Sequence, residues 1–511
     1  MEKVFILDFG SQYTQLIARK VREAKVLSEI VPFNISVEEI KKHAPLGIIL
    51  SGGPASVIGK KVPLPDTEIF KLGIPILGIC YGMQAMAKLL GGVVDNSLKR
   101  EYGRVKVFVD KEDHLFKDIP LEFICWMSHS DQVSKLPLGF KKIAHTKNSK
   151  IAAMADFKHR IYGVQFHPEV IHTQFGKKIL NNFLKKICLS RGEWRISSFV
   201  NDSLVNIRQE VGENKVVLGL SGGVDSSVVA VLLHRAISEK LHCVFVDNGL
   251  LRKGEPEKIK AIFDKRLRMN IHYINAEHRF ISKLKNVIDP EKKRKIIGEE
   301  FVNVFQETAK KIGDIKYLAQ GTLYPDVVES LSAFGGPSAI IKTHHNVGGL
   351  PKKMKLKLVE PLRFLFKDEV RKIGKYLGLT EEMVYRHPFP GPGLAVRIIG
   401  EVTKTRLNIL KEADAIIIEE IKKHGFYRKV WQAFAVLLPV KSVGVMGDER
   451  TYENVLAVRI VKSVDGMTAD WVKMPHHIIE LISNRIINEV RGVNRVVYDI
   501  SSKPPATIEW E

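Results

Sequence analysis

The stretch Gly73-Ile-Pro-Ile-Leu-Gly-Ile-Cys-Tyr-Gly82 decides the fold of the first part of the chain. Gly73 to Ile79 is apolar and has the length of a buried strand, and the residues from Met83 to Leu90 have helical apolar spacing. Cys80 is therefore predicted on a tight turn between a strand and a helix, where the helix N-terminus favours the thiolate. The glycines two positions before and after it permit a strained turn and close approach of the helix. The pattern predicts an α/β domain with a nucleophile at the end of a strand.

Further groups along the chain could complete a reaction centre around this cysteine. The backbone N–H of Tyr81 follows the nucleophile, and that of Gly53 follows an apolar strand, so both can serve an oxyanion hole. His167 and Glu169 are two positions apart at the end of the strand Ile161-Tyr-Gly-Val-Gln-Phe166, so their side chains leave the same face. Glu169 can then orient His167, which predicts a Cys-His-Glu triad.

The motifs around Cys80 and His167 occur together in a known family of enzymes. Gly-x-Cys-x-Gly around Cys80, Ser51-Gly-Gly-Pro54 before it and Phe166-His-Pro-Glu169 after it resemble, in this order, the class I glutamine amidotransferases. The resemblance implies a glutaminase that forms a glutamyl thioester and releases ammonia. It also implies that glutamine is held by Gln84, Ser130 and Asp131. The remaining cysteines are expected to be small buried hydrophobic residues: they are Cys125, Cys188 and Cys243.

A second centre follows the apolar strand Lys215-Val-Val-Leu-Gly-Leu220. The loop after it, Ser221-Gly-Gly-Val-Asp-Ser-Ser227, opens a segment with helical apolar spacing, which predicts an anion site at a helix N-terminus. Glycines let backbone N–H groups face phosphate oxygens, hydroxyls add donors, and Asp225 can hold Mg²⁺ directly or through water. The residues predicted to bind ATP and pyrophosphate are Ser221, Gly222, Gly223, Val224, Asp225, Ser226 and Ser227, with Val246 from the next strand.

The second loop is not a Walker A loop, because Gly-x-x-x-x-Gly-Lys-Ser/Thr does not occur at this position. Ser-Gly-Gly-x-Asp-Ser instead resembles the ATP pyrophosphatase family. That resemblance implies that the β and γ phosphates leave together and that the α-phosphate goes to an acceptor oxygen. Ammonia from a glutaminase could then displace AMP from the adenylated acceptor.

Composition agrees with a multidomain enzyme. The 511 residues have room for about three domains, and 45% apolar residues are usual for globular proteins. No signal peptide or apolar run of membrane-spanning length is present, and the cysteines form no C-x-x-C pair, so we expect a cytoplasmic protein without membrane attachment, disulfide framework or zinc site. The net charge of +22 is not accompanied by an RNA-binding signature. We therefore expect anionic small substrates rather than nucleic acid.

The pattern changes along the chain divide it into domains. A polar joint at Ser190–Trp194 ends the first α/β unit, and the Pro- and Gly-rich stretch Arg386-His-Pro-Phe-Pro-Gly-Pro-Gly393 ends the second. The predicted fold class is α/β, with two doubly wound parallel-sheet domains and a smaller α+β domain. The predicted bounds are 1–190 for the glutaminase, 196–386 for the ATP pyrophosphatase and 387–511 for the C-terminal domain.

The whole chain resembles the glutamine-hydrolysing GMP synthases. The resemblance rests on the order of both centres, Lys342-Thr-His-His-Asn-Val-Gly-Gly-Leu-Pro351, the stretch at 386–393 and the ending Lys503-Pro-Pro-Ala-Thr-Ile-Glu-Trp-Glu511. It implies three substrates, glutamine, Mg-ATP and xanthosine 5′-monophosphate (XMP), and amination of XMP at C2. It also implies a homodimer formed through the C-terminal domain.

The same resemblance assigns further residues. The residues implied to bind XMP are Arg294, Gln432, Lys503, Thr507 and Glu509. The residues implied to form a lid over the adenylated intermediate are Lys342, His344 and His345.

Three alternatives share part of this pattern. An NAD synthetase has the same nucleotide loop but another type of glutaminase, without the turn at Cys80. CTP synthetase and anthranilate synthase share the glutaminase but lack the Ser-Gly-Gly-Val-Asp-Ser loop. A regulatory or RNA-binding relative would need a broken centre, whereas both centres are intact in this sequence.

Overall fold

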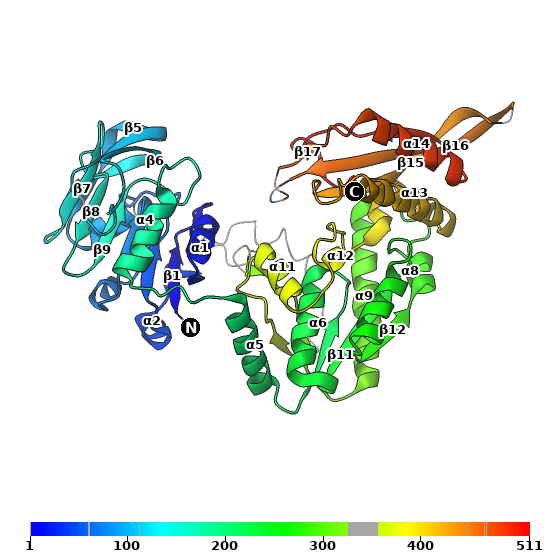
Figure 1. Ribbon diagram of the computed structural model, residues 1–511, viewed down its shortest axis with the longest axis horizontal. Helices are drawn as coiled ribbons and strands as arrows, with labels where there is room; N and C mark the ends of the chain where they lie inside the picture. The colour runs from blue at the N-terminus through cyan, green and yellow to red at the C-terminus, as the bar shows by residue number, and fades with distance from the viewer. Residues whose placement is uncertain are drawn as a thin grey trace. The chain divides into compact units, whose positions relative to one another are not determined.

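The computed structural model describes residues 2–59, 62–111, 113–324, 326, 356–446, 448–463, 466 and 468–511. The chain forms two compact units (Figure 1). The first runs to Phe199 and takes in the short stretch that starts at Leu323, and the second comprises Val200–Thr322 and the described residues beyond 355. The predicted lid residues Lys342, His344 and His345 lie outside the described residues.

A nine-stranded sheet forms the centre of the first unit, in the order β2-β1-β3-β4-β9-β8-β7-β5-β6. The first five strands of this order run parallel, as the buried apolar runs predicted, and the other four are antiparallel. The antiparallel part was not predicted. The strands are β1 (Lys3–Asp8), β2 (Leu27–Pro32), β3 (Gly47–Leu50), β4 (Ile76–Ile79), β5 (Val93–Val109), β6 (Glu122–Lys135), β7 (Lys141–Thr146), β8 (Ala153–Asp156) and β9 (Ile161–Val164).

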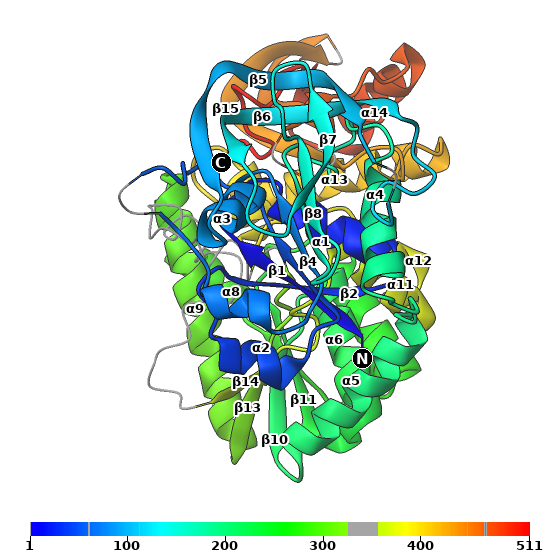
Figure 2. The same ribbon diagram turned by 90° about the vertical axis from the view of Figure 1, so that its left-hand side faces the viewer.

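Helices cover both faces of this sheet (Figure 2). Helices α1 and α4 pack against each other, while Val37 and Ile40 of α2 join Met83 and Met86 of α3 in one apolar cluster. Every residue of β3, β4 and β9 is buried, as expected for strands covered on both sides. The helices are α1 (Thr14–Glu23), α2 (Val37–His43), the 3₁₀ helix η1 (Thr67–Lys71), α3 (Tyr81–Leu89), α4 (Gly176–Asn182) and its π-helical continuation η2 (Phe183–Ile187).

The second unit contains a five-stranded parallel sheet in the order β12-β11-β10-β13-β14. Helix α6 packs against α11, and α8 packs against α9, which agrees with the predicted doubly wound arrangement. The strands are β10 (Lys215–Gly219), β11 (Leu241–Asp247), β12 (Ile271–Asn275), β13 (Ile315–Ala319) and β14 (Lys357–Val359). The helices are α5 (Ile196–Val211), α6 (Val224–Ile237), η3 (Ser238–Lys240), α7 (Glu255–Lys260), η4 (Ala261–Arg266), α8 (Glu277–Lys283), α9 (Pro290–Ile312), α11 (Lys367–Tyr376), α12 (Glu381–Val384) and η6 (Gly393–Arg397).

The end of the chain adds a four-stranded sheet in which β15, β16 and β17 are antiparallel neighbours and β18 pairs with β16 in parallel. One apolar cluster contains Val217 of β10 together with Leu410 of α13 and Ile482 of α14, so this α+β part shares a core with the parallel sheet. The elements are α13 (Lys404–Lys423), β15 (Gln432–Met446), β16 (Glu449–Lys462), β17 (Asp470–Trp471), α14 (His476–Glu489) and β18 (Val493–Tyr498). No helix in the described part of the chain has the length and apolarity needed to span a membrane.

Candidate active site

Cys80 stands on the predicted turn, between the last residue of β4 and the first of α3. Its φ of 51° and ψ of −105° are strained for a residue other than glycine, as is usual for a nucleophile at a strand-to-helix turn. A Cβ atom on Gly82 would lie 2.4 Å from the Leu50 carbonyl oxygen, and one on Gly78 would lie 2.7 Å from the Met83 nitrogen. The turn therefore requires glycine at both positions.

His167 and Glu169 meet beside the cysteine. The His167 Nδ1 lies 2.7 Å from Glu169 Oε1, with 4% of the histidine side chain and none of the glutamate side chain exposed. Burial opposes a charge on the imidazole, but the Glu169 carboxylate and hydrogen bonds with Cys80 and Glu169 outweigh it, so the pKa of His167 lies well above its ordinary value. The pair can therefore hold a proton next to a cysteine thiolate.

Two residues that the sequence analysis missed complete this centre. Gln165, which is fully buried, donates from Nε2 to Cys80 Sγ over 3.6 Å. The Tyr13 ring meets the His167 ring edge-on, with 5.1 Å between centroids. A glutamine directly after an apolar strand is a signal that could have identified Gln165, whereas Tyr13 comes from a distant loop.

The predicted oxyanion residues lie close together. A Cβ atom on Gly53 would be 2.8 Å from the Phe9 carbonyl oxygen and 3.3 Å from Cγ of Tyr81. Only glycine therefore fits between these residues. Tyr81 is itself fixed, because its hydroxyl donates to the Pro63 carbonyl over 2.7 Å.

The residues predicted to hold glutamine gather on α3 and β6. The Gln84 amide donates to the Asp131 carbonyl over 2.8 Å, and Ser130 precedes Asp131 on the strand. His129 Nδ1 lies 2.9 Å from the same carbonyl, and its Nε2 lies 3.2 Å from Glu101 Oε2. The neighbouring Ser128 carbonyl accepts from the Cys80 thiol at 3.7 Å, so this part of β6 forms one wall beside the nucleophile.

The other three cysteines are buried and unpaired, as predicted. Burial raises the pKa of Cys243 to about 12, and it raises those of the Cys125 and Cys188 thiols further still. They therefore remain neutral thiols at physiological pH.

The second predicted loop caps helix α6. Gly222 has a φ of +71°, and a Cβ there would lie 2.4 Å from Cδ1 of Ile259. Hydroxyl groups brace the loop: Ser221 Oγ lies 3.0 Å from Ser226 Oγ, and Ser227 Oγ donates to the Gly223 carbonyl over 2.7 Å. The loop is thus held open at a helix N-terminus, where backbone N–H groups favour a phosphate.

Asp225 of this loop has a partner that the sequence analysis missed. Its Oδ2 contacts the ammonium group of Lys367, the first residue of α11. Close packing of α11 on α6 fixes this approach, since a Cβ on Gly374 would lie 3.2 Å from Val228 Cγ2. The other carboxylate oxygen, Oδ1, is buried and has no hydrogen-bond partner among the described residues. A second cation, in addition to the Lys367 ammonium group, could bind this Asp225 oxygen. This arrangement is compatible with the prediction that Asp225 holds Mg²⁺.

Val246, the predicted ATP contact on β11, is 5% exposed. A pocket of about 340 Å³ lies beside the loop, and its wall includes Gly222, Arg252 and Arg386. Arg386 also donates to the Gly222 carbonyl over 2.9 Å. Arg386 pairs with Glu255 and Arg252 with Asp414, and both acids also line the pocket. Charged groups of both signs therefore border the loop at the carboxyl end of the parallel sheet, the usual place for a ligand in such folds.

Four of the five residues implied to bind XMP lie at, or contact, the last residues of the chain: Gln432, Lys503, Thr507 and Glu509. Glu509 accepts from Arg397 at 2.9 and 3.0 Å and from Gln432 at 2.7 Å. Lys503 donates to the Gly466 carbonyl over 2.8 Å, and the Thr507 carbonyl accepts from Arg459 over 3.0 Å. The ending is therefore ordered by contacts with buried arginines.

Two of these contacts were not predicted. Arg397 and Arg459 are fully buried, and neither was identified from the sequence. Arg294 lies on α9, apart from the last residues of the chain. Its side chain is 41% exposed, and its Nε lies 3.6 Å from Glu291 Oε1. Its neighbour Lys293 is buried and pairs with Glu511 over 2.6 Å, so α9 does reach the end of the chain.

Comparison with known families follows the same order along the chain. Residues 5–187 match the family model "Glutamine amidotransferase class-I", 196–301 match "NAD synthase" and 419–510 match "GMP synthase C terminal domain". Fold and sites together define a class I glutamine amidotransferase joined to a nucleotide-binding domain of the ATP pyrophosphatase type.

Full-length relatives narrow this class. The chain is 57% identical to a protein of Brachyspira hyodysenteriae over 511 residues, covering 100% of this chain and 99% of the relative. It is 58% identical to one of Carboxydothermus hydrogenoformans over 509 residues, with 100% and 99% covered, and 59% identical to one of Aquifex aeolicus over 508 residues, with 99% of each covered. All three are named "GMP synthase [glutamine-hydrolyzing]". The chain belongs to the family of glutamine-hydrolysing GMP synthases, which confirms the resemblance found in the sequence.

Proposed function

We propose that this enzyme makes GMP from XMP, ATP and glutamine through the two centres described above. The observation that carries the proposal is the joint presence of an intact Cys-His-Glu arrangement and an intact Ser-Gly-Gly-Val-Asp-Ser loop in a chain that matches its relatives from end to end. The products would be GMP, AMP, pyrophosphate and glutamate.

At the first centre, Cys80 attacks the side-chain amide carbon of glutamine. His167 gives its proton to the departing nitrogen, which leaves as ammonia, and Glu169 keeps the imidazole oriented throughout. The N–H groups of Gly53 and Tyr81 stabilise the oxyanion, while Gln84, Ser130 and Asp131 hold the glutamine. Water then releases glutamate from the thioester, with His167 as the general base.

At the second centre, the residues from Ser221 to Ser227 hold the β and γ phosphates of ATP. The O2 atom of XMP attacks the α-phosphorus, the O–P bond to pyrophosphate breaks, and ammonia then displaces AMP from C2. Val246 borders the nucleoside. Asp225 would hold Mg²⁺, which neutralises charge on the leaving pyrophosphate when it is bound. Lys367 supplies the cation that a Walker A loop would carry within its own sequence.

Arg294, Gln432, Lys503, Thr507 and Glu509 would position XMP, and Lys342, His344 and His345 would close over the adenylated intermediate. In this assignment Glu509 fixes the end of the chain through Arg397 and Gln432. The domain bounds proposed for these roles remain 1–190, 196–386 and 387–511.

A homodimer through the C-terminal domain is part of the proposal. Large apolar side chains stand exposed on its sheet: Val443 is 51%, Val445 71% and Tyr452 64% exposed. Such a patch supports burial against a second copy. Sedimentation of the wild type as a dimer and of Val445→Lys as a monomer would support this surface, and a monomeric wild type would contradict it. We also place the enzyme in the cytoplasm, in keeping with its unpaired cysteines.

An isotope experiment tests the proposed chemistry. XMP labelled with ¹⁸O at O2 should transfer the label to the phosphate of AMP, because the bond from C2 to O2 breaks when ammonia enters. Unlabelled AMP, with the ¹⁸O released to water or found in inorganic phosphate, would contradict adenylation at O2.

A further inference from the structure

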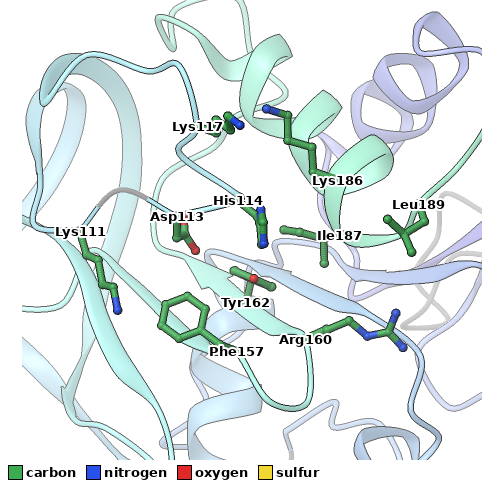
Figure 3. A pocket seen from close by; sticks show the side chains of 10 residues that line it. All are labelled: Lys111, Asp113, His114, Lys117, Phe157, Arg160, Tyr162, Lys186, Ile187 and Leu189. Carbon is green, nitrogen blue, oxygen red and sulfur yellow. The ribbon is translucent and has the colours of Figure 1, made fainter.

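A pocket of about 720 Å³ opens in the first unit at a place that the proposed reaction does not use (Figure 3). The connection that follows β5, the turn between β8 and β9 and the end of η2 form its walls. A volume of this size suits a ligand as large as a nucleotide. None of its lining residues belongs to the Cys80 centre.

The pocket is strongly cationic. Among the described residues, four cations and one acid line it: Lys111, Lys117, Arg160, Lys186 and Asp113. Of the cations, Lys186 also pairs with Asp118 over 3.5 Å. Figure 3 shows Lys117 and Lys186 at the top of the pocket and Lys111 and Arg160 below them, at opposite ends. In the part of the chain that the structure describes, no carboxylate lies within 4.0 Å of the charged groups of Lys111, Lys117 or Arg160. These three cations around one hollow attract an anion, and phosphate is one of the anions that such groups bind.

An apolar wall accompanies the charges. Phe157, Tyr162, Ile187 and Leu189 line the same pocket, and 67% of the Leu189 surface is exposed. Asp113 is engaged with its own loop, because its Oδ1 accepts from the backbone N–H groups of Leu115 and Phe116 and its Oδ2 is buried. A ligand that combines a phosphate with a flat, partly apolar group would use both the cations and the apolar wall.

The position of Arg160 separates this pocket from the glutamine site. Its Nη2 donates to the Gly73 carbonyl over 2.7 Å, and its carbonyl accepts from Ile76 N over 3.1 Å. It therefore stands at the amino ends of the parallel strands β4 and β9, whose carboxyl ends lead to Cys80 and His167. A ligand here and glutamine at Cys80 would lie at opposite ends of the same two strands.

We propose that this pocket is a second binding site for a phosphate-bearing small molecule, with nucleoside monophosphates as the favoured class. The cations hold the phosphate, and the apolar wall of Phe157 and Leu189 receives the base. The shared chemistry is the phosphate, so inorganic pyrophosphate is the competing source.

Calorimetric titration of the full-length enzyme tests the site, with GMP, AMP and inorganic pyrophosphate as separate probes. The pocket variant is Lys117→Gln with Lys186→Gln. The matched control is Lys177→Gln with Lys178→Gln, whose lysines lie on α4, are 64% and 45% exposed and do not line the pocket. We expect the wild type and the control to bind one more equivalent of nucleotide per chain than the pocket variant. If the pocket variant still binds this additional equivalent, its affinity should be at least about tenfold lower.

The outcomes separate the alternatives. Equal stoichiometry and affinity in wild type and pocket variant would overturn the site. An additional equivalent of pyrophosphate without one of either nucleotide would overturn the nucleotide assignment. If the proposed synthetase site did not bind nucleotide but the pocket did, the wild type would bind one equivalent and the pocket variant none. Failure of the synthetase proposal can therefore be distinguished from failure of the pocket proposal.

Discussion

His167 Nδ1 and Glu169 Oε1 are 2.7 Å apart, and only one residue separates His167 from Glu169 in the chain. Since a carboxylate can only accept, the proton of this bond belongs to Nδ1, and Nε2 is the nitrogen left to exchange a proton with Cys80. Both side chains are almost completely buried, which keeps water from competing for the bond. The glutaminase centre is therefore organised before glutamine binds.

The glycine after the nucleophile gives the first prediction. Gly82→Ala would place a Cβ 2.4 Å from the Leu50 carbonyl oxygen, so β3 or the Cys80 turn must move. We expect the glutaminase rate to fall at least about a hundredfold, because displacements of 1 Å at a reacting group have effects of that size. Gly91→Ala is the control: its φ is +89° but nothing lies within 4 Å, so it should cost some stability and leave the rate unchanged. Equal rate losses in both variants would contradict the role assigned to the turn.

The second prediction concerns the cation at the nucleotide loop. Lys367→Ala removes the ammonium group that contacts Asp225, so we expect ammonium-dependent GMP formation to fall about tenfold to a thousandfold and glutaminase turnover to persist. Lys367→Arg should restore part of the activity. The control is Lys372→Ala on the same helix, whose side chain is 63% exposed and whose ammonium group lies 3.7 Å from Asp368, and it should behave as wild type. A Lys367→Ala enzyme with unchanged kcat and unchanged KM for ATP would refute this role.

The end of the chain supplies the third prediction. Glu509→Ala leaves the fully buried Arg397 without its closest carboxylate, and breaking such a pair costs about 3–5 kcal/mol of unfolding free energy. Urea unfolding should report this loss, and the KM for XMP should rise. Glu489→Ala breaks an ion pair with Arg485 whose glutamate is 48% exposed, and it should change stability little. Similar effects of the two substitutions would show that the ending is not held as described.

The fourth prediction is a pH dependence of stability. Burial lowers the pKa of His387 to about 4, while a hydrogen bond to the Tyr427 carbonyl opposes the shift only in part. As the pH falls below the ordinary histidine value of about 6.5, the unfolded chain takes up a proton that the folded chain refuses, so stability decreases down to about pH 4. The total contribution is on the order of 3 kcal/mol.

Unfolding free energies measured between these pH values should therefore rise with pH more steeply in the wild type than in His387→Gln. The glutamine can still donate to the Tyr427 carbonyl but does not titrate. Parallel curves for the two proteins would mean that the histidine is not protected from protonation.

The parts of the fold that were predicted from sequence are those encoded locally. Cys80, Gly82 and their flanking strand and helix lie within a few residues of each other, and the loop from Ser221 to Ser227 is equally continuous. Steric demands on glycine and the apolar periods of strand and helix are visible in such segments without knowledge of the rest of the chain.

The parts that were missed depend on long-range packing. Lys367 is 142 positions from Asp225, and Arg397 is 112 positions from Glu509, so no local pattern pairs them. The antiparallel strands β5 to β8 escaped prediction because their pairing is decided by neighbours distant in sequence. The resemblance to a family named residues that no local pattern indicates. Among them are Gln432 and Glu509, and Gln432 Nε2 donates to Glu509 Oε1 over 2.7 Å.

The central claim is that one chain contains two separable reaction centres joined by ammonia. It is tested most directly by measuring GMP formation with glutamine and with ammonium in two variants, Cys80→Ala and Asp225→Ala. We expect Cys80→Ala to lose glutamine-dependent synthesis and keep ammonium-dependent synthesis, and Asp225→Ala to lose both. Loss of both activities in a folded Cys80→Ala enzyme, or ammonium-dependent synthesis unchanged in Asp225→Ala, would contradict the account.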